Sequence, residues 1–257
     1  MRRSCWYTLN DSKERLYDNI YGRKNIRYEA SGGLIGFLYK KLLRFEVHRC
    51  QAVFNLLPSV AGRLLDLGCG EGDFIFMAKD KFEECYGVDV SSIGIERAKK
   101  ISKDRSYGNN IRFYNGDVDE GLPFNTSFFD VVTCIAVLEH VFNPPNVLDE
   151  IYRVLKPGGM FIVQVPNIAW LPSRFQLLVG RLPMTGGVYL GADWEHLHNF
   201  TKSILCQLLT RKGFEIQSIS CSGVFANYRK WWLSVLGGDM VIKSVKTTPH
   251  VLKECTA

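Results

Sequence analysis

The 257-residue chain is 46% hydrophobic and 23% charged, which excludes a disordered, collagen-like or coiled-coil protein and indicates one globular domain with an extension. Its net charge of +6 arises in residues 1–62, which carry 11 basic and 5 acidic side chains, whereas residues 63–257 carry 21 of each. Nucleic-acid-binding proteins usually show a basic face across their folded part, so no nucleic-acid partner is predicted.

The cysteines show neither close pairing nor the spacing of zinc ligands; they are Cys5, Cys50, Cys69, Cys85, Cys134, Cys206, Cys221 and Cys255. Several lie in apolar runs, where a free thiol behaves as a small hydrophobic group. The N-terminus lacks the apolar core of a signal peptide, and no run approaches the ~18 apolar residues of a membrane helix. A reducing cytoplasm is the predicted location.

The first thirty residues show no sustained hydrophobic period and are interpreted as an arm or lid. Apolar residues then recur at three- and four-residue steps, which predicts an amphipathic helix over residues 36–57 that ends at Pro58. Its apolar face would cover the edge of the following domain while Lys40 and Lys41 stay solvated. The alternative is an interfacial helix that makes peripheral contact with a membrane.

After Pro58, short apolar strands alternate with helical segments, which favours a mostly parallel, doubly wound sheet covered by helices on both faces. The expected strands are residues 63–67, 85–90, 111–114, 129–136, 160–165, 214–221 and 239–246. The expected helices begin just after Gly72 and span 93–103, 145–155 and 202–212, with Thr201 as an N-cap. Residues 166–195 are predicted to be irregular. Ligands of such sheets bind at the carboxyl ends of the strands.

A glycine-rich turn follows the first of these strands, in the segment Leu65-Asp66-Leu67-Gly68-Cys69-Gly70-Glu71-Gly72. Glycines let the backbone turn tightly and approach a ligand without a Cβ in the way. The next strand ends at Asp89, where an acid can accept both hydrogen bonds of a ribose diol. The pattern therefore predicts a nucleoside-type ligand. A dinucleotide fingerprint needs a third glycine where Asp73 stands, which counts against NAD.

Further motifs follow in order: Gly116-Asp117-Val118, Leu122-Pro123-Phe124, Phe129-Asp130-Val131-Val132 and Arg153-Val154-Leu155-Lys156-Pro157-Gly158-Gly159. With the glycine turn, they resemble the class I S-adenosylmethionine-dependent methyltransferases over about residues 60–246. The resemblance implies a Rossmann-like three-layer α/β/α sandwich. Its seven-stranded, mostly parallel sheet has an antiparallel, inserted last strand, here residues 239–246. It also implies S-adenosylmethionine as the cofactor.

The resemblance assigns cofactor-binding roles residue by residue. The backbone of Gly68, Cys69 and Gly70 would lie against the methionine moiety and ribose, with Asp66 near the ammonium group. Asp89 would bind the ribose hydroxyls and Val90 would lie beside the adenine. The Asp117 carboxylate would accept from the adenine amino group and the Val118 N–H would donate to a ring nitrogen. Ile135 and Ala136, at the end of the fourth strand, would face the sulfonium.

The side of the pocket that would hold the methyl acceptor has fewer motifs. His140, with Glu139 before it, follows the fourth strand and is the first candidate base or acceptor-orienting group. The alternative is that the pair only caps a turn and shapes the cofactor pocket. One Glu-His pair is too little for a metal site, and none is predicted. His196 and His198 could orient an acceptor hydroxyl, with structural hydrogen bonding as the alternative.

The chain is thus divided into an N-terminal arm and helix (1–58), a methyltransferase domain (59–246) with an acceptor-side insertion (166–200), and a tail (247–257). The expected activity is methyl transfer to a small-molecule, glycan or lipid-precursor acceptor, at oxygen. The insertion also resembles that of MetW-like methyltransferases, so the alternative is a cofactor-binding regulatory partner of a biosynthetic protein, without methyl transfer of its own.

Overall fold

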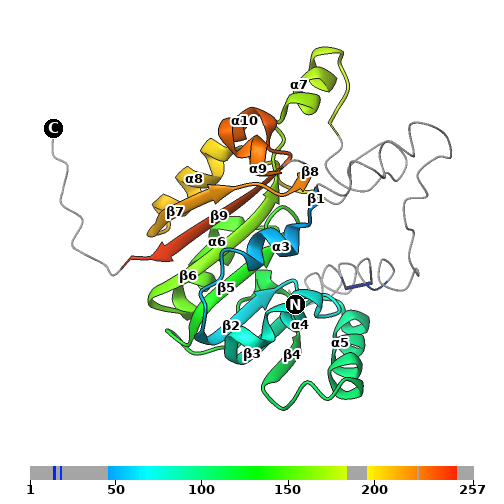
Figure 1. Cartoon of the computed structure of the whole chain (residues 1–257), viewed down its shortest axis with the longest axis vertical. Coiled ribbons are helices and arrows are strands. Elements are labelled where there is room, and N and C mark those ends of the chain that lie inside the picture. Colours follow the sequence, from blue (N-terminus) through cyan, green and yellow to red (C-terminus); the bar gives the residue numbers. More distant parts are fainter. Residues whose placement is uncertain (1–13, 16–17, 19–45, 184–195, 225, 248–257) are drawn as a thin grey trace, which may run out of the picture.

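The computed structural model describes residues 14, 15, 18, 46–183, 196–224 and 226–247 (Figure 1). Most of them build one seven-stranded sheet of order β4-β3-β2-β5-β6-β9-β7. Its strands are β2 (Ala61–Leu67), β3 (Phe82–Asp89), β4 (Ile111–Asn115), β5 (Phe129–Ile135), β6 (Leu155–Pro166), β7 (Phe214–Ser220) and β9 (Asp239–Lys246). Every strand expected from the sequence is therefore present.

The strand pairing confirms the expected topology. Strands β4, β3, β2, β5 and β6 run parallel, while β9 is antiparallel to both β6 and β7, between which it lies. The carboxyl ends of β2, β3, β4 and β5 therefore meet at one edge of the sheet, where a doubly wound fold places its ligand. The last strand is inserted and antiparallel, as predicted.

Helices cover both faces of the sheet, which completes the three-layer sandwich. One buried cluster unites apolar side chains of α6 (Pro144–Val154) and α8 (Lys202–Arg211) with one face. A second unites those of α3 (Arg49–Phe54), α4 (Asp73–Ala78) and α5 (Ser92–Asp104) with the other. Successive side chains of a strand point to opposite faces of the sheet, so neighbouring residues contribute to different clusters. Leu64 belongs to the second cluster and Leu65 to the first.

Side-chain caps fix the starts of the longer helices. Ser91 accepts from the Gly94 N–H at the start of α5, Asn143 from the Asn146 N–H at α6, and Thr201 from the Ile204 N–H at α8. The last of these is the predicted N-cap. Each cap satisfies a backbone donor that would otherwise have no partner within the helix.

The helix expected over residues 36–57 is interrupted at residues 46–48, and only Arg49–Phe54 of its second half is helical. Glu46–Val47 form β1, which pairs antiparallel with β8 (Gly223–Val224), and α3 begins only at Arg49. His48 breaks the helix because its backbone is extended (ψ 143°) and its side chain accepts from the Cys50 N–H as an N-cap. Residues 36–45 lie outside the described part of the chain.

The segment after β6 also differs from the expectation. Leu171–Leu178 form a helix, α7, which extends away from the sheet in Figure 1, while residues 184–195 lie outside the described part. Three short helical turns, α9 (Ala226–Arg229), η4 (Lys230–Trp232) and α10 (Leu233–Leu236), precede β9. No helix among the described residues is long and apolar enough to cross a membrane.

Candidate active site

The glycine-rich turn joins β2 to α4 with three left-handed residues. Gly68, Gly70 and Gly72 have φ values of 68°, 53° and 88°, a region that side chains with a Cβ rarely adopt. The N–H groups of Gly68 and Cys69 both donate to the Val88 carbonyl of β3, at 2.8 and 3.1 Å. The turn is therefore held against the end of the neighbouring strand.

Asp89, the last residue of β3, is held by two backbone donors. Its Oδ2 accepts from the Gly70 N–H and its Oδ1 from the Ser91 N–H, both at 2.8 Å. Burial raises the pKa of this carboxyl, and the two N–H donors act in the opposite direction. Since each carboxylate oxygen has two lone pairs, each can still accept one hydroxyl of a diol.

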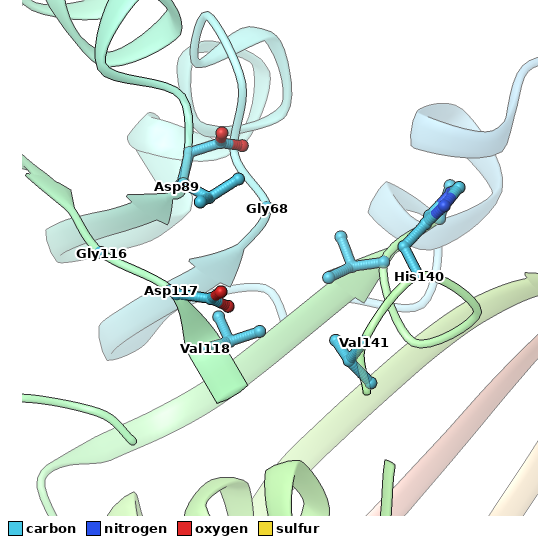
Figure 2. Close-up of a pocket in the computed structure, with 10 residues that line it drawn as sticks. Gly68, Asp89, Gly116, Asp117, Val118, His140 and Val141 are labelled. Atoms are coloured by element: carbon cyan, nitrogen blue, oxygen red, sulfur yellow. The ribbon is translucent and has the colours of Figure 1, made fainter. Parts of the chain in front are cut away.

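A pocket opens at this edge between the ends of β2, β3 and β5 (Figure 2). Its lining residues are Gly68, Asp89, Val90, Gly116, Asp117, Val118, Ala136, Val137, His140 and Val141. In Figure 2, Asp89 and Asp117 lie on one side of the pocket and His140 on the facing side. The pocket thus joins the predicted nucleoside-binding carboxylates to the predicted acceptor-side imidazole.

The predicted cofactor residues divide into two groups. Six line the pocket, namely Gly68, Asp89, Val90, Asp117, Val118 and Ala136, whereas Asp66, Cys69, Gly70 and Ile135 do not. Ala136 has a φ of +55°, an uncommon backbone for a residue with a Cβ, and its N–H donates to the Gln164 carbonyl. Such strained positions often lie at ligand sites.

Asp66 lies beneath the turn, on β2. It is 3% exposed, and its Oδ1 accepts from the Thr133 hydroxyl at 2.7 Å. Burial raises the pKa of the Asp66 carboxyl to about 7, against the effect of the Thr133 hydrogen bond. A cation bound nearby would favour the ionised form, so this residue responds to both pH and ligand charge.

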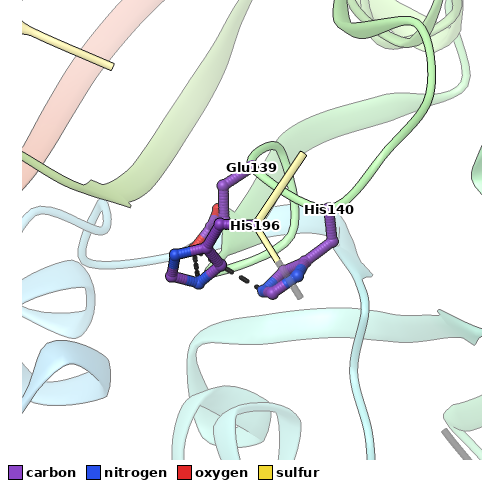
Figure 3. A group of neighbouring side chains, drawn as sticks. All are labelled: Glu139, His140 and His196. Carbon is purple, nitrogen blue, oxygen red and sulfur yellow. Dashed lines mark ion pairs between the residues drawn. The ribbon is translucent and has the colours of Figure 1, made fainter. Parts of the chain in front are cut away.

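A second group of polar side chains meets on the acceptor side of the pocket (Figure 3). The Glu139 Oε1 lies 3.9 Å from His140 Nε2 and 4.0 Å from His196 Nε2, and the two imidazole centroids are 4.6 Å apart. No local sequence pattern links His196 to the Glu139–His140 pair. Their meeting depends on the chain returning after α7.

His198 is placed differently from His196. Its backbone N–H donates to the Glu139 carbonyl at 3.0 Å, beside the Leu197 N–H at 2.9 Å. Its Nε2 is buried without a hydrogen-bond partner among the described residues. The structure therefore brings the backbone of His198, but not its imidazole, into the group around Glu139.

Four residues near the site were not predicted. Gly116, Val137 and Val141 line the pocket as neighbours of predicted residues. Asp18 lies in the segment predicted to be an arm, and its carboxylate accepts from the Ser91 and Ser92 hydroxyls at 2.6 and 3.1 Å and from the Ile93 N–H. No local pattern marks Asp18, because its partners lie more than 70 residues away.

The model of the family described as "Methyltransferase domain" matches residues 58–213. The fold is Rossmann-like, with a pocket at the carboxyl ends of its strands. With that match, the chain belongs to the methyltransferase-domain family.

The similar proteins include quinone methyltransferases. Demethylmenaquinone methyltransferase of Leptospira interrogans is 32% identical over 167 residues, which cover 61% of this chain and 66% of that protein. Ubiquinone/menaquinone biosynthesis C-methyltransferase UbiE of Rickettsia prowazekii is 29% identical over 156 residues, covering 58% and 60%. The chain thus covers less than two thirds of either relative.

Solved structures of other proteins have a fold similar to that of this chain. The crystal structure of a protein from Listeria monocytogenes, described as an S-adenosylmethionine-dependent methyltransferase, superposes with a TM-score of 0.61 at 19% identity. The superposition covers 78% of this chain and 97% of that one. At this level of identity the likeness concerns the fold alone.

The raised pKa of Asp66 predicts a pH-dependent stability. The folded protein keeps this proton up to about pH 7, whereas the unfolded chain loses it near 3.8, so the free energy of unfolding falls as the pH rises between these values. We expect the free energy of unfolding of Asp66→Asn to decrease less over this pH range than that of the wild type, by up to roughly 4 kcal/mol. Urea unfolding at pH 4.5 and 7.5 measures it.

The matched control is Glu83→Gln, which changes an exposed acid on β3. It should keep the pH dependence of the wild type. A curve for Asp66→Asn that runs parallel to the wild type would contradict the assignment.

Proposed function

We propose that this chain is a methyltransferase that uses S-adenosylmethionine and methylates a hydroxyl oxygen of a small acceptor molecule. The observation that carries the proposal is that Asp89 and His140 line the same pocket, at facing sides. One end suits a nucleoside and the other suits an acceptor that must lose a proton. Membership of the methyltransferase-domain family supports the same activity.

The residues present fit this cofactor. A Cβ on Gly68 would collide with the Val137 side chain, so the turn has no room for a larger residue where the cofactor would approach. In the proposal Asp89 binds the ribose hydroxyls, Asp117 and Val118 bind the adenine, and Asp66 stabilises the ammonium charge. When bound, the cofactor supplies an activated methyl group, so the protein needs mainly to align the acceptor and exclude water.

The imidazole group supports an oxygen acceptor. A hydroxyl must lose its proton as its oxygen attacks the methyl carbon, and His140 lines the pocket where that hydroxyl would lie. The side chains of His140 and His196 are largely buried, with 15% and 7% exposure. In the proposal they orient the acceptor hydroxyl and promote loss of its proton.

A second candidate function is methylation of a ring carbon. The name of the Rickettsia relative, a C-methyltransferase of ubiquinone and menaquinone biosynthesis, favours it. Loss of a proton from a phenolic hydroxyl also activates the neighbouring ring carbon as a nucleophile, so the same imidazoles would serve either reaction. The two candidates differ in the atom that receives the methyl group.

The surface of α7 supports a lipid-linked acceptor. Phe175, Leu178 and Val179 are 60%, 80% and 70% exposed, and Arg174 and Arg181 lie among them. Residues 166–183 carry no acidic side chain. Exposed apolar side chains with cationic neighbours are typical of segments that bind anionic membrane surfaces. We propose that α7 makes the peripheral membrane contact that the sequence suggested for the N-terminal helix.

The cytoplasm remains the proposed location. The described cysteines form no disulfide; they are Cys50, Cys69, Cys85, Cys134, Cys206 and Cys221. Burial raises the pKa of the Cys85 thiol to about 12, which keeps it uncharged and unreactive within the core. Six described thiols that form no disulfide suit a reducing compartment.

The atom that receives the methyl group can be identified directly. The protein is incubated with S-adenosylmethionine labelled with ¹³C in its methyl group and with catechol or hydroquinone acceptors, and the product is examined by NMR. We expect a methoxy carbon signal. An aryl C-methyl signal would contradict oxygen transfer and support the second candidate. Cofactor binding without product from any acceptor would contradict an enzyme and favour the regulatory alternative.

Two variants should separate cofactor binding from turnover. Asp89→Asn should weaken binding of S-adenosylhomocysteine by roughly 10- to 100-fold, because charged hydrogen-bond acceptors contribute about 1.5–3 kcal/mol. His140→Gln should leave this affinity within about threefold and lower kcat by roughly 100-fold. Calorimetry and steady-state kinetics measure the two effects, with Glu83→Gln as the control. Unchanged affinity in Asp89→Asn would exclude its ribose contact.

Membrane contact through α7 predicts binding to anionic vesicles. We expect the protein to sediment with vesicles that contain phosphatidylglycerol and Leu178→Glu to weaken this binding by roughly tenfold, the effect of removing one large apolar side chain from the interface. Val60→Glu is the matched control, since Val60 is 77% exposed and precedes the amino end of β2, whereas α7 follows the carboxyl end of β6. Equal vesicle binding by Leu178→Glu and Val60→Glu would contradict membrane contact through α7.

A further inference from the structure

Glu139, His140 and His196 have the donor atoms of a metal site. One carboxylate oxygen and one nitrogen of each imidazole all lie within 4.8 Å of one another. Figure 3 shows the two imidazoles and the carboxylate converging from two segments of the chain. Two imidazoles and one carboxylate form a ligand set that binds transition metals in proteins, with further positions left open.

The backbone holds these side chains in place. The Glu139 carbonyl accepts the N–H groups of both Leu197 and His198, which ties the segment carrying His196 to the turn after β5. The turn is closed by the His140 N–H, which donates to the Val137 carbonyl at 2.8 Å. Glu139 is 1% exposed, so the group differs from a solvated cluster of surface acids. Buried carboxylates of this kind are paired or coordinate metals.

We propose that Glu139, His140 and His196 bind one divalent transition metal ion of the Zn²⁺ type. Ligand atoms at about 2.0–2.1 Å from a tetrahedral zinc ion are separated by about 3.4 Å. The two Glu139–imidazole distances are 3.9 and 4.0 Å and all three donor atoms lie within 4.8 Å of one another, so closure onto the ion requires movements of roughly 0.5–1.4 Å. Rotation of the imidazole side chains supplies these. The two nitrogen donors disfavour Mg²⁺ and Ca²⁺, which prefer oxygen ligands.

The ion would serve the acceptor, and this role rests on the proposed function. His140 lines the cofactor pocket, so an open coordination position beside it is within reach of an acceptor hydroxyl. Coordination lowers the pKa of that hydroxyl, whose proton passes to water. Its oxygen then forms a bond with the methyl carbon, while the carbon–sulfur bond breaks and its electron pair stays on sulfur. His140 would then act as a ligand and not as a base.

Metal binding can be measured without any methyl transfer. The full chain is stripped with a chelator and titrated with Co²⁺, whose visible absorption reports on coordination, and Zn²⁺ is then added as a competitor. We expect one Co²⁺ per chain, displacement by Zn²⁺ and none by equimolar Mg²⁺. Glu139→Gln and His196→Asn should each weaken binding by at least tenfold.

The matched control is His198→Gln, which removes an imidazole from the same segment outside the three-residue group. It should keep the wild-type affinity for Co²⁺. Failure to bind Co²⁺, or equal affinity in all three variants, would overturn the site. A loss in His198→Gln as large as in His196→Asn would overturn the proposed ligand set.

Binding of S-adenosylhomocysteine to the same samples separates this inference from the proposed function. Normal nucleoside binding in a protein that takes up no Co²⁺ would overturn the metal site and leave the methyltransferase proposal standing. Melting temperatures of the metal-free variants within about 3 °C of the wild type exclude a folding defect. Metal binding with unchanged methyl transfer in the stripped protein would overturn the role of the ion in acceptor activation.

Discussion

The hydrogen bond from the Gly70 N–H to the Asp89 carboxylate, at 2.8 Å, is the contact on which the pocket depends. It joins the turn after β2 to the end of β3, two parallel strands that are neighbours in the sheet. The left-handed glycines let the backbone of the turn approach the Asp89 carboxylate. This carboxylate lines the pocket, and each of its oxygens can accept a further hydrogen bond. The remaining strands and both helical layers hold these two strand ends in register.

The acceptor side is organised by a different backbone contact. The Glu139 carbonyl receives two N–H groups from residues 197 and 198, which brings two imidazoles and a buried carboxylate together beside the pocket. Both sides of the pocket are therefore positioned by backbone hydrogen bonds at the carboxyl ends of strands. Substitution of a single side chain there should leave the fold in place, so binding and turnover can be studied separately.

The sheet and the cofactor side could be predicted because their signals are local. Each apolar run of strand length is a local pattern in itself, and the glycines before α4 lie within about 20 residues of Asp89 at the next strand end. The meeting of Glu139 with His196 could not be predicted, since more than 50 residues separate them and their contact depends on tertiary structure. The helix predicted over 36–57 is interrupted at residues 46–48 for one long-range and one local reason. The hydrophobic period of the sequence continues through Glu46–Val47, but these residues pair with β8 as a strand. The helix α3 begins only after its N-cap, His48.

In the proposed complex, the nucleoside lies at Asp89 and the transferred methyl group lies beside Glu139, His140 and His196. A crystal structure of the protein with S-adenosylhomocysteine tests this most directly. It should show both ribose hydroxyls on the Asp89 carboxylate and the sulfur atom at the end of the pocket lined by Ala136 and His140. A ribose bound away from Asp89, or a sulfur atom directed away from His140, would contradict the account.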